Sequence, residues 1–381
     1  MRRNIPYYLM LLIALFTFSC EDEVESPPPP PEEDVETLID IEYNPTPFSI
    51  EYPQYVQLIN DREVIIPEMP IPADNPMTEE GVELGRHLFY DKLLSRDNTL
   101  SCASCHLPQG AFTDNLAVSP GVDGVSGKRS SMSLLNVGFF DNGLFWDGRS
   151  TTLEEQALLP VEDEIELHNT WENVIDLLQE SEMYKTMFRK AFGIEKSSEI
   201  SKELAAKAIA QFERSIVSFE SRFDKFLKGE TFQLDDDELY GFEMYIDAPG
   251  VTDAQCAHCH NLPLMTSNDY FNNGLQEAET FEDFVDKGQG VFTTPNRNGF
   301  FRAPSLRNIE HSAPYMHNGS IQTLEEVIEH YASGGKPSPS KDPLLDDITL
   351  TEYDKEALLK FLLALTDEQV INQERLQDPF E

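Results

Sequence analysis

Two motifs with the pattern Cys-x-x-Cys-His constrain this chain more than any other feature. They read CASCH at residues 102–106 and CAHCH at residues 256–260. Such a motif places two thiols one helical turn apart with a histidine directly after the second. Both sulfurs can then attach to the vinyl groups of a haem while the imidazole ligates its iron. The sequence therefore predicts two covalently bound c-type haems, with these attachment and proximal-ligand residues: Cys102, Cys105, His106, Cys256, Cys259 and His260.

The cysteine count and the spacing of the motifs argue against other uses of the thiols. The chain has five cysteines, and the two motifs use four of them. The remaining one is Cys20, so no pair is left for a structural disulfide. A zinc ribbon needs two CxxC pairs roughly 15 to 20 residues apart, whereas these two motifs lie about 150 residues apart. A thioredoxin-type CxxC needs no following histidine and sits in a βαβ unit, for which the sequence shows no pattern.

The N-terminal segment predicts export. Arg2 and Arg3 precede an apolar stretch too short to span a bilayer, and Cys20 follows a small residue. We expect residues 1–20 to be a lipoprotein signal peptide, cleaved before Cys20; ordinary secretion is the alternative. Residues 21–60 are acidic and proline-rich and predict an extended tether. The expected location is the periplasm or cell envelope, with membrane contact only through a lipid anchor at Cys20.

The charge of the chain limits its partners. The formal net charge is -41 at pH 7. A surface of this sign repels nucleic acids and anionic lipids, and it favours small neutral substrates or basic protein partners.

An internal repeat extends beyond the haem motifs. After the first motif come SLLN at residues 133–136 and FWDGRSTTLEE at residues 145–155. After the second come SLRN at residues 305–308 and YMHNGSIQTLEE at residues 315–326. In each copy the threonine and the second glutamate of TLEE form a capping-box pattern, which predicts a helix start. The repeat suggests a duplicated cytochrome c unit.

The two copies differ in the helix that follows. Seven residues beyond Leu324 stands Tyr331, whereas seven residues beyond Leu153 stands Pro160. A tyrosinate can bind iron, but proline offers no side-chain ligand. The repeat therefore predicts one haem capped by a protein ligand and one with an open face. Other residues that could ligate the second haem in place of Tyr331 are Met316, Met265 and His330.

Polar side chains after the first motif could serve an open haem. Gln156 and Glu166 follow the WDGR segment, and a carboxylate there could move a proton between the oxygens of a bound peroxide. Position alone does not separate Glu166 from Glu162 or Glu164. Trp146 could relay electrons between two haems or could be an ordinary core residue.

These residues resemble the bacterial di-haem cytochrome c peroxidases, especially their MauG-like branch. The resemblance runs from about Pro67 to Asp367 and includes several specific segments. Among them are LGRHLFYDKLLSRDNTLSCASCH, FWDGR, LEEQALLPVEDEIEL, CAHCH, APSLRN and APYMHNG. It implies that the haem on His106 is peroxidatic and that the haem on His260 accepts electrons. Tyr331 stands where the peroxidases carry an axial methionine and the MauG-like branch carries a tyrosine.

The resemblance also implies roles near the first haem. Trp146 matches the family tryptophan between the haems, Gln156 the distal glutamine and Glu166 the catalytic glutamate. Pro160 matches the distal proline of the MauG-like branch.

Two positions depart from the wider family. Many relatives hold a loop histidine over the resting peroxidatic haem, and Val122 stands near that position here, so we expect no reductive activation. The family binds calcium between its domains through an asparagine, and that position is Ser130 here. Carbonyl ligands would fall near Arg302 and Pro304, which leaves the predicted calcium site short of one ligand.

The predicted fold is mainly α, with two cytochrome c-like haem domains related by internal duplication. We expect an N-terminal peroxidatic domain at 61–223 and a C-terminal electron-transfer domain at 224–381. An apolar stripe supports helix in the first domain; it comprises Leu204, Ala208, Phe212, Ile216, Phe219 and Phe223. Thr351 with Asp354 predicts the start of the last helix.

The predicted function is reduction of hydrogen peroxide to water with electrons from an exported cytochrome c or cupredoxin. One alternative is oxidation of residues in a partner protein, as the MauG-like branch implies. The other is a non-catalytic electron carrier with both haems six-coordinate.

Overall fold

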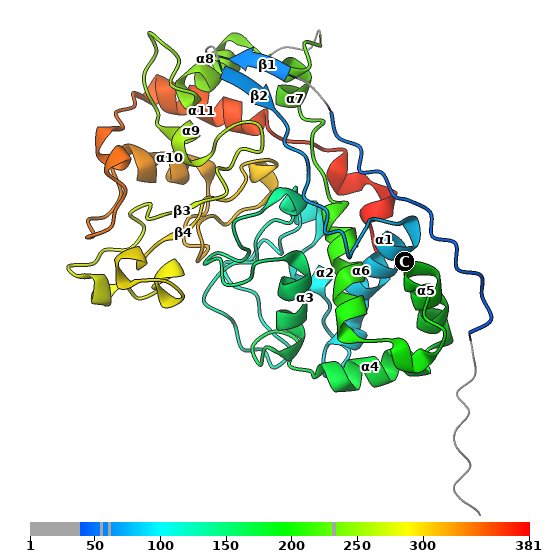
Figure 1. Cartoon of the computed structure of the whole chain (residues 1–381). Coiled ribbons are helices and arrows are strands. Elements are labelled where there is room, and N and C mark those ends of the chain that lie inside the picture. Colours follow the sequence, from blue (N-terminus) through cyan, green and yellow to red (C-terminus); the bar gives the residue numbers. More distant parts are fainter. Residues whose placement is uncertain (1–38, 54–55, 60–61, 231–233) are drawn as a thin grey trace, which may run out of the picture. The chain divides into compact units, whose positions relative to one another are not determined.

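The computed structural model describes residues 39–53, 56–59, 62–230 and 234–381. The predicted signal peptide and the lipid site at Cys20 lie outside the described residues. Within them the chain is mainly helix and loop, as the sequence predicts (Figure 1). The α-helices are α1 Glu79–Tyr90, α2 Cys102–Cys105, α3 Leu153–Glu162, α4 Trp171–Glu180, α5 Glu182–Phe192, α6 Lys202–Arg214, α7 Arg222–Leu227, α8 Asp236–Tyr245, α9 Cys256–Cys259, α10 Leu324–Ala332 and α11 Glu352–Leu363.

The strands of the described residues form two short antiparallel pairs. β1 (Val56–Ile59) pairs with β2 (Arg62–Ile65), and β3 (Tyr270–Phe271) pairs with β4 (Phe301–Arg302). No helix in the described part of the chain is long and apolar enough to cross a membrane.

The first helical core forms where α1 crosses α6, with α3 and α5 packed beside them (Figure 1). The crossing is close because Gly85 has no side chain. A Cβ atom there would lie 1.9 Å from the Ala208 carbonyl oxygen and 2.9 Å from Cβ of Phe212. The rings of Phe89 and Phe212 pack at 5.1 Å next to this crossing.

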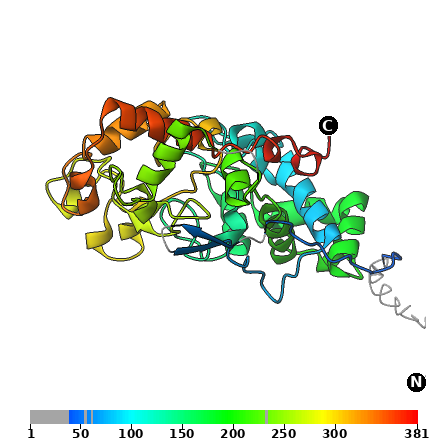
Figure 2. The ribbon, with the colours of Figure 1, turned by 90° about the horizontal axis from the view of Figure 1, so that it is seen from above.

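A second core repeats this crossing between α8 and α11, with α10 against α11. Here Gly241 is the glycine. Its Cβ would lie 2.2 Å from the Ala357 carbonyl oxygen and 2.9 Å from Cβ of Phe361. Phe223 and Phe242 pack around Phe361 at ring distances of 5.2 and 5.3 Å. Figures 1 and 2 show the helices of the two cores gathered in two groups.

The SLxN segments take the same conformation in both halves. Asn136 and Asn308 both have a left-handed backbone, with φ of 60° and 56°. The Asn136 N–H donates to the Ile216 carbonyl at 2.9 Å, and the Asn308 N–H donates to the Leu365 carbonyl at 3.2 Å. Each asparagine thus ties the haem-side loop to the chain just after the long helix of its own core.

Both predicted helix starts are present. The side chains of Thr152 and Thr323 accept hydrogen bonds from the third helical N–H of α3 and α10. The reciprocal half of the capping box forms only in α10. In α3 the Glu155 carboxylate binds the N–H and hydroxyl of Thr151 instead. Thr351 and Asp354 form the predicted capping box of α11.

The apolar stripe of the first half spans two helices rather than one. α6 ends at Arg214, and α7 begins at Arg222. Ile216 and Phe219 lie in the non-helical segment between them and are buried all the same, with 0% and 3% exposure. Between α6 and α7 the apolar spacing therefore indicates buried side chains and does not indicate a helix.

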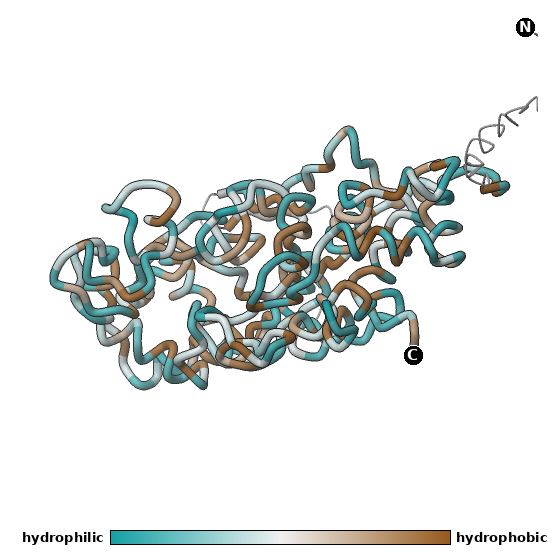
Figure 3. Tube along the Cα trace, turned by 90° about the horizontal axis from the view of Figure 1, so that it is seen from below, coloured by the Kyte–Doolittle hydropathy of each residue, from teal (hydrophilic) through white to brown (hydrophobic). Residues whose placement is uncertain are grey.

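The C-terminal segment returns to the first core. Val370, Ile371 and Leu376 are buried among its side chains, and Figures 1 and 2 show this segment beside α1. The domain boundary near Phe223 stays a prediction. Figure 3 shows hydrophilic residues along the outer loops, in keeping with the acidic composition.

Candidate active site

The first CxxCH motif forms α2, and His106 follows it directly. The Nδ1 atom of His106 lies 2.9 Å from the Phe112 carbonyl oxygen. This contact fixes the ring with Nδ1 protonated and leaves Nε2 available as a ligand. Burial lowers the pKa of His106, so the imidazole is neutral, as a metal ligand must be.

The second motif has the same geometry. It forms α9, and His260 Nδ1 lies 2.9 Å from the Pro304 carbonyl oxygen. Burial lowers the pKa of His260 to about 4. His258, the other histidine of this motif, is half-exposed, contacts Asp247 at 3.2 Å and does not line the second cavity.

Each motif opens onto a cavity. The first cavity, of about 730 Å³, is lined by Cys102, Cys105 and His106. The second, of about 180 Å³, is lined by Cys256, Cys259 and His260. All four thiols are free of disulfides. In each cavity two thiols and one imidazole with an available Nε2 converge, which is the donor set that a c-type haem requires.

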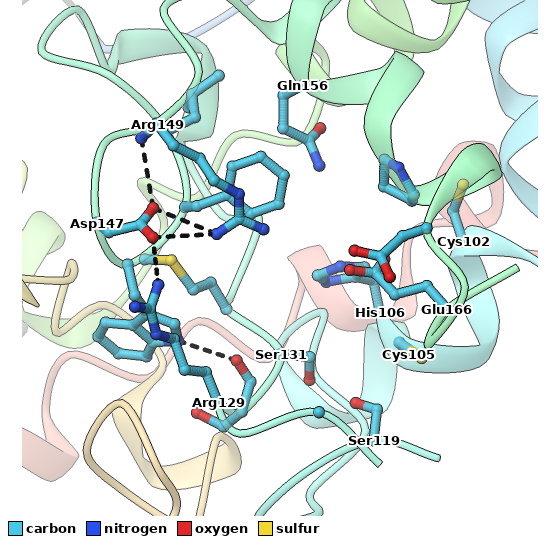
Figure 4. Close-up of a pocket in the computed structure, with 18 of the residues that line it drawn as sticks. Cys102, Cys105, His106, Ser119, Arg129, Ser131, Asp147, Arg149, Gln156 and Glu166 are labelled. Atoms are coloured by element: carbon cyan, nitrogen blue, oxygen red, sulfur yellow. Dashed lines mark hydrogen bonds and ion pairs between the residues drawn. The ribbon is translucent and has the colours of Figure 1, made fainter. Parts of the chain in front are cut away.

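Three residues predicted around the open haem line the first cavity. They are Gln156 and Pro160 on α3 and Glu166 in the loop that follows. Figure 4 shows Gln156 and Glu166 directed into the space beside His106. Glu162 and Glu164 are exposed and do not line the cavity. The geometry therefore separates Glu166 from the two neighbouring glutamates, which the sequence pattern alone could not do.

Glu166 has the pKa of a group that exchanges protons near neutrality. Burial and, to a smaller extent, the nearby Asp163 carboxylate raise its pKa to about 7, and the Arg149 charge opposes both effects. Such a carboxyl both accepts and returns a proton at physiological pH. A hydrogen bond of 2.9 Å from the Val122 N–H to the Glu166 carbonyl oxygen holds the loop backbone.

Trp146 lines both cavities. Its indole N–H donates to the Ser130 carbonyl oxygen at 2.9 Å. Ser130 in turn donates its N–H to the His317 carbonyl at 2.9 Å and its hydroxyl to the Met316 carbonyl at 3.1 Å. These contacts fix the indole between the two sites. Arg302 is another residue shared by the two cavities.

Tyr331 lines the second cavity together with Met316. The Asn273 amide nitrogen lies between them, 3.4 Å from the Tyr331 hydroxyl and 3.2 Å from the Met316 sulfur. Met265 and His330 do not line this cavity, and His330 Nε2 lies 2.9 Å from the Asn273 carbonyl oxygen. Of the four ligands considered from the sequence, the geometry leaves Tyr331 and Met316 in the lining of this cavity.

The hydrogen bonds around Ser130 leave few oxygen atoms free to bind a calcium ion. Its hydroxyl is engaged with the Met316 carbonyl, and the Pro304 carbonyl accepts from His260. Within the described ranges no group of three or more His, Cys, Asp or Glu side chains could hold a metal ion. Calcium stays a prediction without support from the contacts.

A charged network beside Trp146 did not emerge from the sequence. Asp147, which is 3% exposed, pairs with Arg129 at 2.5 Å and with Arg149 at 3.2 Å. The Arg149 guanidinium lies 3.5 Å from the centre of the Phe145 ring and lines the first cavity. Figure 4 shows both arginines converging on the carboxylate. The sequence signal for this network was the pair of charged residues on either side of the glycine in WDGR, Asp147 and Arg149.

Comparisons with known proteins identify the family of the chain. Residues 79–232 match the family described as "Di-haem cytochrome c peroxidase". The chain is 33% identical over 303 residues to the methylamine utilization protein MauG of Methylorubrum extorquens, covering 79% of this chain and 82% of that protein. It is 34% identical over 264 residues to the cytochrome c551 peroxidase of Nitrosomonas europaea, covering 69% of this chain and 76% of that protein.

A solved structure extends the likeness to the fold. The crystal structure of a MauG-like protein associated with microbial copper homeostasis matches with a TM-score of 0.75 at 37% identity. It covers 83% of this chain and 97% of that one. The family is defined by two haems, and this chain supplies two CxxCH sites that fit them. The chain belongs to the di-haem cytochrome c peroxidase family and carries two c-type haems.

Proposed function

We propose that this protein reduces hydrogen peroxide to water at the first haem site, with electrons that enter through the second. The balance is one hydrogen peroxide, two electrons and two protons to two waters. One observation carries the proposal: Gln156, Pro160 and Glu166 line the cavity of His106, whereas Tyr331 lines the cavity of His260. The first site thus combines Glu166 and Gln156 with a non-ligating distal residue, whereas the second presents a residue that can ligate iron.

The haems supply electron transfer and, at an open axial position, an iron centre at which an O–O bond can be cleaved. The protein groups supply the rest. When haem is bound, His106 would ligate its iron, and Pro160 brings no side-chain ligand to the cavity. Glu166 would accept a proton from one oxygen of a peroxide and return it to the other oxygen, which would leave as water. The Gln156 amide orients the peroxide by hydrogen bonding.

Trp146 connects the two sites. Its ring lines both cavities, and its indole N–H is held by the Ser130 carbonyl. A large aromatic ring fixed between two redox centres shortens the distance that an electron must cross. We assign it the transfer between the second site and the first.

The electron donor is proposed to be a small exported cytochrome c or cupredoxin with a basic face. The net charge of -41 attracts such a partner over long range. Because this attraction is electrostatic, turnover with a basic donor should fall as ionic strength rises.

A second candidate is oxidation of residues in a partner protein. Tyr331 in the second cavity favours it, since a tyrosine at this position marks the MauG-like branch, and the chain is similar to a MauG protein. Both candidate functions use the same chemistry at the first site. They differ in the electron source, which is a small donor protein in the first and the oxidised partner protein in the second.

Two experiments separate the candidates. An EPR spectrum of the resting ferric protein should show one high-spin and one low-spin haem; a purely low-spin spectrum would identify an electron carrier instead. Steady-state assays with hydrogen peroxide and reduced c-type cytochromes or cupredoxins should then show turnover. High-spin haem without turnover with any of these donors would favour the partner-protein reaction.

We further infer that the two halves derive from one duplicated cytochrome c unit, here assigned to 61–223 and 224–381. The support is the pair of glycine crossings, at Gly85 against α6 and Gly241 against α11, and the matching turns at Asn136 and Asn308. We also propose that the protein is exported and anchored through Cys20. Mass spectrometry of the mature N-terminus tests the anchor, because acylation adds the mass of its lipid chains.

A further inference from the structure

Glu213 on α6 is another buried carboxyl at the first cavity, and it has no part in the steps above. It is 4% exposed and lines the same cavity as His106 and Glu166. Its Oε2 atom has no hydrogen-bond partner. A buried ionised carboxylate without a partner is costly, so such a group is held protonated or awaits a charge that the bare protein does not provide.

The neighbouring cation does not neutralise Glu213. Arg214 follows it on α6, but its guanidinium binds both oxygens of Glu154 on α3 at 2.7 and 3.0 Å. Burial raises the pKa of Glu213 to about 8; the Arg214 charge opposes this shift and the Glu154 charge adds to it. Because Arg214 and Glu154 form a closed pair, their fields largely cancel at Glu213.

The other elements packed on α6 bring few ionisable groups. α1 meets it through Gly85 and the rings of Phe89 and Tyr90. From α5, the Tyr184 hydroxyl donates to Asp91. The haem-site groups Cys102, His106 and Glu166 share the cavity with Glu213. The cavity is also lined by the paired charges of Arg129, Asp147, Arg149 and Asp286, and by Lys128, Asp163 and Lys287.

Two interactions at the Cys102 thiol indicate that Glu213 lies close enough to the first haem for their charges to interact. The Glu213 carboxylate helps to raise the pKa of the Cys102 thiol, which is the first attachment point of the haem. The Glu166 carboxylate acts on the same thiol from elsewhere in the cavity. Because Glu213 and the attachment residue Cys102 line one cavity, a charge that changes at the attached haem should change the proton affinity of Glu213, since the interaction between the two is reciprocal.

We propose that Glu213 is the proton site coupled to reduction of the first haem site. Its carboxylate binds one proton from solvent for each electron that this site gains and releases the proton when the electron leaves. Charge is thereby balanced inside a cavity where an unpaired charge is costly. Of the two protons that peroxide reduction consumes, one can then be carried in with an electron rather than drawn through the protein afterwards.

The test is a spectroelectrochemical titration of the di-haem protein at a series of neutral and alkaline pH values, without peroxide. In the wild type the midpoint potential of the first haem should fall as pH rises through the Glu213 titration. In Glu213→Gln, which mimics the protonated acid, that pH dependence should be lost. Glu203→Gln, an exposed change on the same helix, should keep it, and the second haem serves as an internal reference in every variant.

An unchanged pH slope in Glu213→Gln would overturn the proposal. Glu166→Gln is measured in parallel, because Glu166 titrates in the same cavity and should remove a separate step at lower pH. If Glu213→Gln fails to incorporate two haems, the same titration is carried out on Glu213→Asp. This shorter carboxyl should retain a pH-dependent potential with its midpoint shifted, and an unshifted profile would exclude Glu213. The proposal rests on the haem site of the proposed function and not on peroxide turnover, so an inactive peroxidase would leave these outcomes readable.

Discussion

The first and second haem sites are built from the same parts and end in different cavities. Each has a CxxCH helix, a proximal histidine held by a backbone carbonyl at 2.9 Å, and a helix that begins at a TLEE threonine. Yet the first cavity measures about 730 Å³ and the second about 180 Å³. On the distal helix, Pro160 faces the larger cavity and Tyr331 the smaller.

This difference teaches where function resides in a repeated fold. The positions that hold the backbone together recur, such as Gly85 and Gly241 at the helix crossings. The positions that face the iron differ, because one site must admit a substrate and the other must exchange electrons without binding one. Ligation and access thus differ between the two sites, whereas the helix packing is shared.

The largest expected effect is at Glu166, the proposed acid–base group of the first site. Glu166→Gln should lower kcat for peroxide by roughly 10²–10⁴-fold, the usual range for loss of a general acid–base residue. Glu162→Gln and Glu164→Gln are the matched controls, since both glutamates are exposed and lie outside the cavity. Equal losses in all three would mean that charge and not proton transfer is responsible.

The same residue predicts a pH profile. Burial raises the pKa of Glu166 to about 7, and the group must be ionised to take the proton from peroxide. The value of kcat/KM should therefore rise with pH through about 7 and should lose this step in Glu166→Gln. A profile that falls as pH rises through this range would assign the step to another group.

The shared packing should respond alike in both halves. Gly85→Ala and Gly241→Ala each place a Cβ against a backbone carbonyl, at 1.9 and 2.2 Å. Each change should cost roughly 1–3 kcal/mol in the free energy of unfolding, the usual cost of overpacking. Urea denaturation followed by haem absorbance measures it, with Gly127→Ala as the control, because a Cβ atom there would meet no atom closer than 3.8 Å. A loss in only one half would contradict the equivalence of the two crossings.

The sequence predicted the haem-binding residues because covalent attachment demands a fixed local pattern. Helix starts were equally local, and Thr152 and Thr323 were both predicted. The apolar stripe was less informative, because Ile216 and Phe219 are buried outside a helix. Spacing of apolar residues reports burial, and the chain can satisfy it in an extended loop.

Three-dimensional properties of the site were not predictable in this way. The separation of Glu166 from Glu162 depends on how a loop turns after α3. Trp146 between the cavities, and Glu213 as a polar residue inside an apolar helix face, depend on which surfaces the helices bring together. No local pattern encodes these relations, although an acidic residue in a buried stripe was a signal that could have been followed.

The link between the two sites should show a smaller effect. Trp146→Phe keeps an aromatic ring but removes the indole, so donor-dependent turnover should fall by about tenfold, or about 1.4 kcal/mol in the barrier. Trp171→Phe is the matched control, because Trp171 is buried in the first core, donates to the Leu158 carbonyl and lines neither cavity. Stopped-flow spectra of the two haems after mixing with peroxide measure the transfer directly. Unchanged kinetics in Trp146→Phe would remove Trp146 from the path.

The smallest effect on turnover is expected at Tyr331, where the two sites differ by a single ligand. Tyr331→Phe should convert the second haem from low-spin to high-spin in the EPR spectrum while peroxide turnover changes only a few-fold, since chemistry occurs at the other site. Tyr315→Phe is the control, because Tyr315 lines the same cavity but donates its hydroxyl to the Ile309 carbonyl. A low-spin second haem in Tyr331→Phe would point to Met316, whose sulfur is held 3.2 Å from Asn273. In that case the double variant Tyr331→Phe/Met316→Leu should give the high-spin signal. The ligand that distinguishes the second site from the first site with its Pro160 would then be Met316 and not Tyr331.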